Sequence, residues 1–285
     1  VAIVFETTDS IQHMFLRYLD KSHPALKKPG QCGLSAKVIE DLYVRMDGLV
    51  GRVRQALDAK SVLVVMSDHG FKSFRRGVNL NSWLLANGYM SLKDGRSASG
   101  EWFKDVDWDK TRAYALGLGG LYLNLRGREA QGTVAPGREE KALRAELARK
   151  IAGLNDPAAG AVAVTNVYDK DAVYAGPYKD NAPDLIIGYN EGYRASWDGV
   201  TGIVNGIVFE DNAKAWSGDH CIDPALVPGV LFSNLKIKSR GPSIMDIAPT
   251  ALELFGLKPP AHMDGRSLVD AADPFGDGGA GEKAS

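Results

Sequence analysis

The sequence lacks the features that mark disulfide-rich secreted proteins, membrane-spanning proteins and general nucleic-acid binders. It has two cysteines in 285 residues, Cys32 and Cys221, which are too few for a disulfide framework. No apolar run approaches the roughly 20 residues that a transmembrane helix needs. The formal net charge is −1, so the protein as a whole does not attract nucleic acid or a membrane surface. Any anion must therefore be bound by a local site.

The composition is that of a folded protein with a sizeable core, because 45% of the residues are apolar and 24% are charged. The chain opens at Val1 without an initiator methionine, and Val1–Phe5 has the pattern of a buried strand, which predicts a piece of a longer protein. Signals for a compartment would lie in the missing part. We expect residues 1–270 to form the C-terminal portion of one domain, with a flap or small insertion region within 90–200. The glycine-rich residues 271–285 are predicted to be a disordered tail.

The valine-rich run Ser61–Met66 predicts a strand that is buried on both faces, as in a parallel sheet covered by helices. The strand gives way to Asp68 and His69, and Gly70 allows a sharp turn after them. In open α/β sheets, ligands bind at the carboxyl ends of the strands. A carboxylate beside a neutral imidazole is half of a site for a divalent metal ion, although a polar turn after a core strand explains the same residues.

A second pair of this kind follows the opening strand. If a helical turn begins near Asp9, His13 lies four residues on and on the same face, where the two side chains can grip one ion. On these residues alone, a helix cap beside a partly buried histidine is the preferred alternative. The predicted helix over 36–58 leads into the strand at 61–66, which makes a βαβ unit and brings Asp9 and Asp68 to the same edge of the sheet.

The third pair is Asp219 and His220, which precede an apolar strand at 227–232. A histidine in a loop carries little information by itself, but the chain has only five histidines. Cys221, next to His220, is expected to be a small buried side chain and not a thiolate ligand. No role is assigned to the other two histidines, His23 and His262.

Other periodic segments predict further elements of an α/β protein. Helices are expected at 79–86, 138–154 and 246–256, and strands at 114–125, 161–168 and 184–189. Arginines at three positions could attract a phosphate, although solvated surface charge explains them as well. These candidates for substrate binding are Arg75, Arg76 and Arg194.

The three pairs together suggest a binuclear metal site. The candidate ligands are Asp9, His13, Asp68, His69 and His220. Carboxylate and imidazole ligands suit zinc or manganese better than calcium. With Asp9, His13 and His220 on one ion, that ion keeps an open position, whereas Asp68 and His69 make an incomplete second site. Two ions roughly 4 Å apart stabilise the attacking and leaving oxygens of phosphoryl transfer. A mononuclear iron site built from the first set would leave the second unexplained.

These motifs resemble the alkaline phosphatase superfamily, most of all its phosphohydrolase/phosphomutase branch, which is related to the type I phosphodiesterase/nucleotide pyrophosphatase family. The matching segments, in family order, are Thr8–His13, Met66–Phe71, Arg76–Asn81, Gly218–His220, Asp246–Thr250 and Met263–Ser267. The resemblance implies a three-layer α/β/α fold with a mixed, largely parallel central sheet that lacks its first strand or strands here. It also implies two divalent ions, zinc or else manganese, on the ligand sets given above, with Asp219 orienting His220.

The function that the resemblance implies is hydrolysis of a small phosphoric ester, a monoester or a diester, with nucleotides among the candidates. The family's threonine or serine nucleophile and one further aspartate would precede Val1, so we expect these 285 residues alone not to turn over substrate. A phosphomutase that uses the same site is one alternative. A catalytically silent relative that acts as a scaffold is another. No membrane segment and no general nucleic-acid partner are expected.

Overall fold

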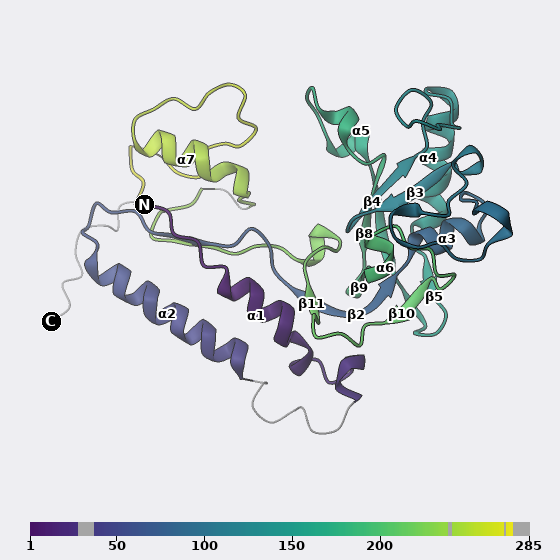
Figure 1. Ribbon diagram of the computed structural model, residues 1–285. Helices are drawn as coiled ribbons and strands as arrows, with labels where there is room; N and C mark the ends of the chain where they lie inside the picture. The colour runs from purple at the N-terminus through teal and green to yellow at the C-terminus, as the bar shows by residue number, and fades with distance from the viewer. Residues whose placement is uncertain (28–36, 239–240, 271, 276–285) are drawn as a thin grey trace. The chain divides into compact units, whose positions relative to one another are not determined.

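The computed structural model describes residues 1–27, 37–238, 241–270 and 272–275. The chain divides into two compact units (Figure 1). Unit 1 consists of Val1–Leu42 and Phe71–Val227, and unit 2 of Tyr43–Gly70 and Pro228–Ser285. Most of the predicted disordered tail, residues 271 and 276–285, lies outside the described residues.

Unit 1 alternates short helices and strands. Its α-helices are α1 Thr7–Phe15, α3 Leu80–Ala86, α4 Arg138–Ile151, α5 Lys170–Val173 and α6 Trp197–Val200. Its strands are β2 Lys72–Val78, β3 Ala113–Leu116, β4 Gly120–Leu123, β5 Asn155–Asp156, β6 Ala161–Val162, β7 Val164–Asp169, β8 Leu185–Tyr189, β9 Gly192–Ala195, β10 Phe209–Asp211 and β11 Gly218–Asp219. Short 3₁₀ turns occupy Leu16–Tyr18, Pro24–Lys27, Lys93–Gly95, Glu101–Phe103, Trp108–Lys110, Lys179–Asn181 and Pro224–Leu226.

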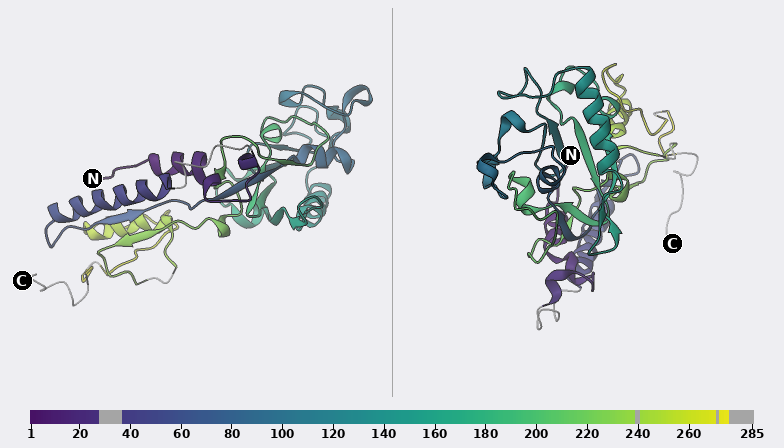
Figure 2. Two further views of the ribbon diagram at one scale, coloured as in Figure 1. Left: turned by 90° about the horizontal axis from the view of Figure 1, so that it is seen from below. Right: turned by 90° about the vertical axis from the view of Figure 1, so that its right-hand side faces the viewer.

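The main core of unit 1 lies between a four-stranded antiparallel sheet and α4. The strand order is β3-β4-β8-β7, and β3 and β4 form a hairpin that pairs Ala113 with Leu123. Helix α4 packs along β7, and Figures 1 and 2 show this helix lying against the strands of unit 1. The helix expected over 138–154 is confirmed, and Leu143, Leu147 and Ile151 are buried at the four-residue spacing of one helix face.

Strand β2 is the centre of the second sheet of unit 1. Strands β10 and β11 pair with it antiparallel, and β9 pairs with it in parallel. The register sets Arg194 of β9 opposite Gly77, and Asp219 of β11 opposite Lys72. Arg194 and Asp219, which are distant in the sequence, are thereby held in the same sheet.

The α/β class is confirmed, but the predicted largely parallel central sheet is not. Among the paired strands of the described residues, β2 and β9 run parallel and the other pairs run antiparallel. Strands joined by a tight turn, such as β3 and β4, can pair only antiparallel. The apolar pattern of a strand carries little information on the direction of its neighbour.

Two expectations for the first strands are corrected. The prediction of a strand at Val1–Phe5 is wrong, since these residues are exposed and form none. The strand expected at 61–66 is shorter, β1 Val64–Met66, and it is not buried on both faces: Val64 is 37% and Met66 39% exposed. Within the described residues β1 pairs only with β12, Leu231–Ser233, and a two-stranded sheet has too few neighbours to bury both faces. The predicted βαβ pairing is therefore not formed.

Unit 2 combines this two-stranded sheet with α7, Ile247–Leu254, and with the part of α2, Val38–Ala56, from Tyr43 onward. Helix α2 confirms the helix expected over 36–58, and α7 confirms the helix expected near the C-terminus. Asp246 stands at the N-cap of α7 and accepts a hydrogen bond from the backbone N–H of Arg266.

No helix in the described part of the chain combines the length and the apolar character that crossing a bilayer requires.

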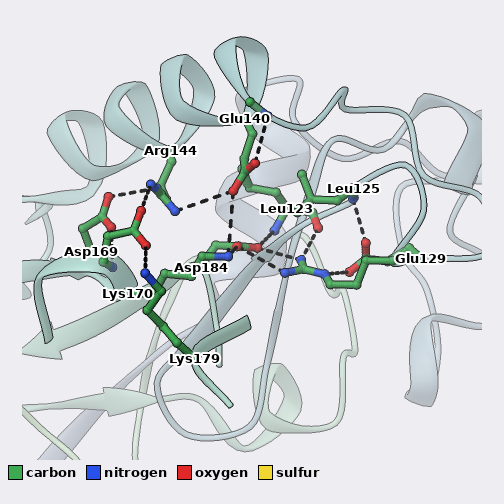
Figure 3. A network of polar contacts seen from close by, with 12 residues as sticks. Leu123, Leu125, Glu129, Glu140, Arg144, Asp169, Lys170, Lys179 and Asp184 are labelled. Carbon is green, nitrogen blue, oxygen red and sulfur yellow. Dashed lines mark hydrogen bonds and ion pairs between the residues drawn. The ribbon is translucent and has the colours of Figure 1, made fainter. Parts of the chain in front are cut away.

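A network of ion pairs ties α4 to the end of the four-stranded sheet (Figure 3). The carboxylate of Asp184 is fully buried and accepts hydrogen bonds from Arg128, Lys170 and the backbone N–H of Leu123. Burial alone would raise the pKa of Asp184, but these donors outweigh it and hold the pKa below its usual value. Asp184 is therefore an ionised group whose charge is compensated inside the fold.

Helix α4 contributes a second buried cation to this network. The side chain of Arg144 is 6% exposed and pairs with Glu140, Asp169 and Asp171. Glu140 also lies 3.8 Å from the ammonium group of Lys170, which joins the Arg144 cluster to the Asp184 cluster. The network therefore fixes α4 and α5 against the sheet.

Candidate metal centre

Helix α1 places an acid and an imidazole one turn apart, as the spacing of Asp9 and His13 predicts. Asp9 Oδ2 lies 3.4 Å from His13 Nε2. The His13 side chain is 5% exposed and that of Asp9 is 41% exposed. The carboxylate is therefore open to solvent while the imidazole is held inside unit 1.

The residue after β11 brings a second imidazole to the same carboxylate. His220 Nε2 lies 3.7 Å from Asp9 Oδ1, and ligand atoms of Asp9, His13 and His220 all lie within 4.8 Å of one another. Two atoms that each lie about 2.0–2.1 Å from a tetrahedral zinc ion are about 3.3–3.4 Å apart. The donor set fits one divalent ion, and the two distances to Asp9, 3.4 and 3.7 Å, lie close to this spacing.

The orientation of His13 is set by a hydrogen bond to a backbone carbonyl. His13 Nδ1 lies 2.7 Å from the carbonyl oxygen of Gly218, so this nitrogen carries the proton and donates it. In the neutral ring, Nε2 then presents a lone pair toward Asp9. A hydrogen bond from the second ring nitrogen to a backbone carbonyl is the usual way in which proteins orient a metal-binding histidine.

Aromatic side chains hold the two imidazoles in place. Trp216 stacks on His13 with 3.8 Å between ring centroids and 27° between planes. Phe71 meets His13 edge-on at 4.7 Å and His220 at 5.2 Å. Sequence reasoning missed Trp216 and Phe71, although each lies within four residues of a predicted ligand: Trp216 precedes His220, and Phe71 follows His69.

Close backbone contact docks α1 on the loop before His220. The backbone N–H of Ser217 donates to the carbonyl of His13 at 2.6 Å. Gly218 lies directly against the helix, because a Cβ at this position would stand 2.5 Å from the carbonyl oxygen of Gln12 and 2.9 Å from Leu16 Cβ. Glycine is therefore required where the helix and the strand carry their ligands toward each other.

Gly218→Ala is expected to weaken divalent-metal binding by about 10- to 100-fold, because the added methyl group pushes α1 and its two ligands away from His220. Titration with Zn²⁺ measures the change. Gly48→Ala is the matched control, since a Cβ at Gly48 meets nothing within 4 Å, and its metal affinity should equal that of the wild type. Equal affinities in both variants would contradict the proposed docking.

Both oxygens of Asp219 have partners within the protein, although Asp219 also forms a second group of possible ligands with His220 and Cys221. Oδ1 accepts hydrogen bonds from the backbone N–H groups of His220 and Cys221, both at 2.9 Å. Oδ2 accepts one from the Trp216 indole N–H at 2.9 Å and pairs with Arg194 Nε at 2.8 Å. Burial would raise the pKa of Asp219, but Arg194 and these donors hold it below its usual value. The carboxylate therefore acts as an ionised anchor for the loop.

Cys221 is a free cysteine, and burial raises the pKa of its thiol to about 12. Its Sγ lies 3.9 Å from His220 Nδ1. A thiol with so high a pKa is protonated at neutral pH, and the side chain is half-buried, not fully buried as expected.

Asp68 and His69 belong to unit 2, in the loop that follows β1. Asp68 Oδ2 lies 3.5 Å from His69 Nε2, and His69 Nδ1 lies 3.1 Å from the carbonyl oxygen of Gly70. The Asp68 side chain is 71% exposed and that of His69 is 24% exposed. The two predicted ligands thus face each other, with the imidazole oriented as His13 is, by a backbone carbonyl.

The arginines predicted to bind substrate are engaged with carboxylates. Arg75 pairs with Asp20, and Arg76 pairs with both Asp156 and Asp211. Arg194 is 2% exposed. Its pairing with Asp219 turns its guanidinium into the protein.

Comparison with known proteins identifies one family. A family model described as type I phosphodiesterase/nucleotide pyrophosphatase matches residues 1–199. This range includes Asp9, His13, Asp68 and His69, and it ends before His220. No curated protein matches the chain.

Proposed function

Because the chain belongs to the type I phosphodiesterase/nucleotide pyrophosphatase family, within the alkaline phosphatase superfamily, we propose that it is a metal-dependent hydrolase of phosphoric esters. The observation that carries the proposal is the convergence of one carboxylate and two imidazoles, from Asp9, His13 and His220. Three such ligands leave a tetrahedral ion one open position, which is the arrangement of catalytic zinc sites.

A divalent ion at this cluster would polarise a phosphoryl oxygen and neutralise charge that develops during phosphoryl transfer. Neighbouring residues would hold the ligands of this ion in position. His13 is fixed by the Gly218 carbonyl and by stacking on Trp216, and His220 is fixed through its backbone N–H on Asp219. Asp9, which is 41% exposed, leaves the cluster open to a small ester from solvent. Zinc is the proposed ion and manganese the alternative, because both accept nitrogen and oxygen ligands.

We further propose that Asp68 and His69 contribute to a second ion, as in a two-metal phosphoryl-transfer site. Their ligand atoms lie 3.5 Å apart, close to the spacing of two ligands on one ion. In the sequence only Gly70 separates His69 from Phe71, the residue whose ring packs against both imidazoles of the first cluster. The substrate class that suits two such ions is a phosphoric monoester or diester, including nucleotide esters.

Hydrolysis of aryl phosphate monoesters and diesters tests the function, with any residues that precede Val1 in the natural protein included. We expect hydrolysis that a chelator abolishes and that Zn²⁺ or Mn²⁺ restores. Transfer of the phosphoryl group to a second substrate in place of water would show a mutase. Hydrolysis that is indifferent to chelation would contradict the proposal, and so would the absence of any phosphoryl transfer by the metal-loaded protein.

His69→Ala is expected to lower the metal content by about one ion per chain and to abolish turnover, while the ion at Asp9, His13 and His220 remains. Metal analysis after equilibrium dialysis measures the stoichiometry. His262→Ala removes a histidine that has no assigned role and serves as the control. An unchanged metal content in His69→Ala would remove Asp68 and His69 from the site.

A further inference from the structure

Arg194 is the most completely buried cation beside the candidate metal centre, and its surroundings do not suit an anionic substrate. Its side chain is 2% exposed and lies 4.4 Å from the ring centroids of both Phe74 and Trp197. One nitrogen, Nη1, donates to the carbonyl of Ala195 at 3.0 Å. Aromatic faces on a guanidinium replace water by favourable cation–π contacts and fix its plane.

Arg194 also contacts Asp219, the carboxylate that directly precedes His220 in the chain. Arg194 Nε lies 2.8 Å from Asp219 Oδ2, and the Asp219 side chain is 5% exposed. Two charges at such depth depend on each other, because removing one leaves the other without compensation in a medium that solvates it poorly. Arg194 thus holds the Asp219 carboxylate in place.

Asp219 reaches the two imidazoles by separate routes. Its Oδ1 accepts the backbone N–H of His220, which sets where that side chain leaves the loop. Its Oδ2 accepts the indole N–H of Trp216, and the indole stacks on the ring of His13. One carboxylate therefore fixes a ligand from the loop after β11 and a ligand from α1.

We propose that Arg194 is a positioning residue of the metal centre. Its contact holds Asp219 in place, so that Asp219 orients His220, and Trp216 orients His13, toward a common ion. This inference rests on the proposed metal site and gives Arg194 a role other than the substrate contact that the sequence predicts. Groups that orient the direct ligands typically change metal affinity by 10- to 100-fold when removed.

Three substitutions in the full 285-residue chain test the proposal, with Zn²⁺ affinity and the visible spectrum of bound Co²⁺ as readouts. Arg194→Met should weaken Zn²⁺ binding by about 10- to 100-fold and alter the Co²⁺ spectrum, which reports ligand geometry. Arg194→Lys keeps the charge and should recover part of the affinity. Trp216→Phe keeps an aromatic ring on His13 but loses the N–H to Asp219, so a smaller loss is expected.

Arg144→Met is the matched control, because Arg144 is also a buried arginine that pairs with carboxylates, and it lies in the α4 network instead of at the metal centre. We expect it to lower stability and to leave Zn²⁺ affinity and the Co²⁺ spectrum as in the wild type. Asp219→Asn combined with Arg194→Met should lose no more affinity than the larger single loss, since both act through one contact.

The outcomes separate this inference from the proposed function. Folded Arg194→Met protein with wild-type Zn²⁺ affinity and an unchanged Co²⁺ spectrum would overturn the positioning role. A raised KM in that variant, measured with any residues that precede Val1 in the natural protein included, would indicate a substrate contact instead. Metal binding that depends on Arg194 would support the positioning role, and an absence of phosphoryl transfer by that longer protein would overturn the hydrolase. Absence of metal binding by the wild type would overturn both.

Discussion

Replacing His13 by alanine is expected to abolish the binding of one metal ion and to lower phosphoric-ester hydrolysis by roughly 10³-fold or more. In the proposed site His13 is one of three ligands, and the two that would remain, Asp9 and His220, would hold an ion only weakly. A bound ion contributes several kcal/mol of charge stabilisation, and each 1.4 kcal/mol corresponds to a factor of about ten in rate. Metal analysis and turnover, both expressed per folded protein and with any residues that precede Val1 in the natural protein included, measure the two losses.

His23→Ala is the control for this substitution, because His23 is also a buried histidine of unit 1. His23 Nε2 donates to the carbonyl of Phe74, and burial lowers the pKa of the ring, so it is neutral and takes no part in the cluster. We expect His23→Ala to lose stability and to keep the full metal content. Loss of metal in His23→Ala to the same extent as in His13→Ala would show that general unfolding, and not loss of a ligand, causes the effect.

Asp184→Ala is expected to lower the free energy of unfolding by about 3–5 kcal/mol, which is the range for breaking a buried ion pair from one side. The substitution leaves Lys170 and Arg128 without the fully buried carboxylate that compensates them, and the backbone N–H of Leu123 loses its acceptor. Denaturant unfolding followed by circular dichroism measures the difference. Asp171→Ala is the control: its side chain is 43% exposed, and Arg144 keeps Glu140 and Asp169, so the loss should stay below about 1 kcal/mol.

The contribution of Asp184 also has a defined pH dependence. Its pKa is lowered in the folded state from a value of 3.8, so the unfolded state takes up the proton first as the pH falls. The difference between wild type and Asp184→Ala should therefore be constant at neutral pH and shrink as the pH falls below about 4. A difference that stays constant down to the acid transition would contradict the assignment of the effect to the charge of Asp184.

The sequence predicts local elements of this protein better than it predicts their pairing. The helices at 36–58 and 138–154 follow from apolar residues at helical spacing, and such spacing is a property of the segment itself. The strand at Val1–Phe5 was predicted from the same kind of local evidence and is absent. A strand forms only when another strand pairs with it, and the sequence of one segment does not show which other segment will pair with it.

For the site, the spacing of Asp9 and His13 predicts one face of a helix, and the structure brings His220 to that face. The role of Arg194 could not be predicted, because its partner Asp219 lies 25 residues away and meets it only through the pairing of β9 and β11 with β2. In the sequence, Arg194 follows Gly192 closely, and an arginine in a glycine-containing loop suggests an anion site. Its burial between the rings of Phe74 and Trp197 appears only in the folded chain.

A crystal structure of the protein grown with zinc, examined for the anomalous signal of the metal, tests whether Asp9, His13 and His220 bind one ion. We expect a zinc ion about 2.0–2.2 Å from a carboxylate oxygen of Asp9 and from Nε2 of both His13 and His220. A zinc ion bound elsewhere while these three residues keep their contacts without one would contradict this expectation.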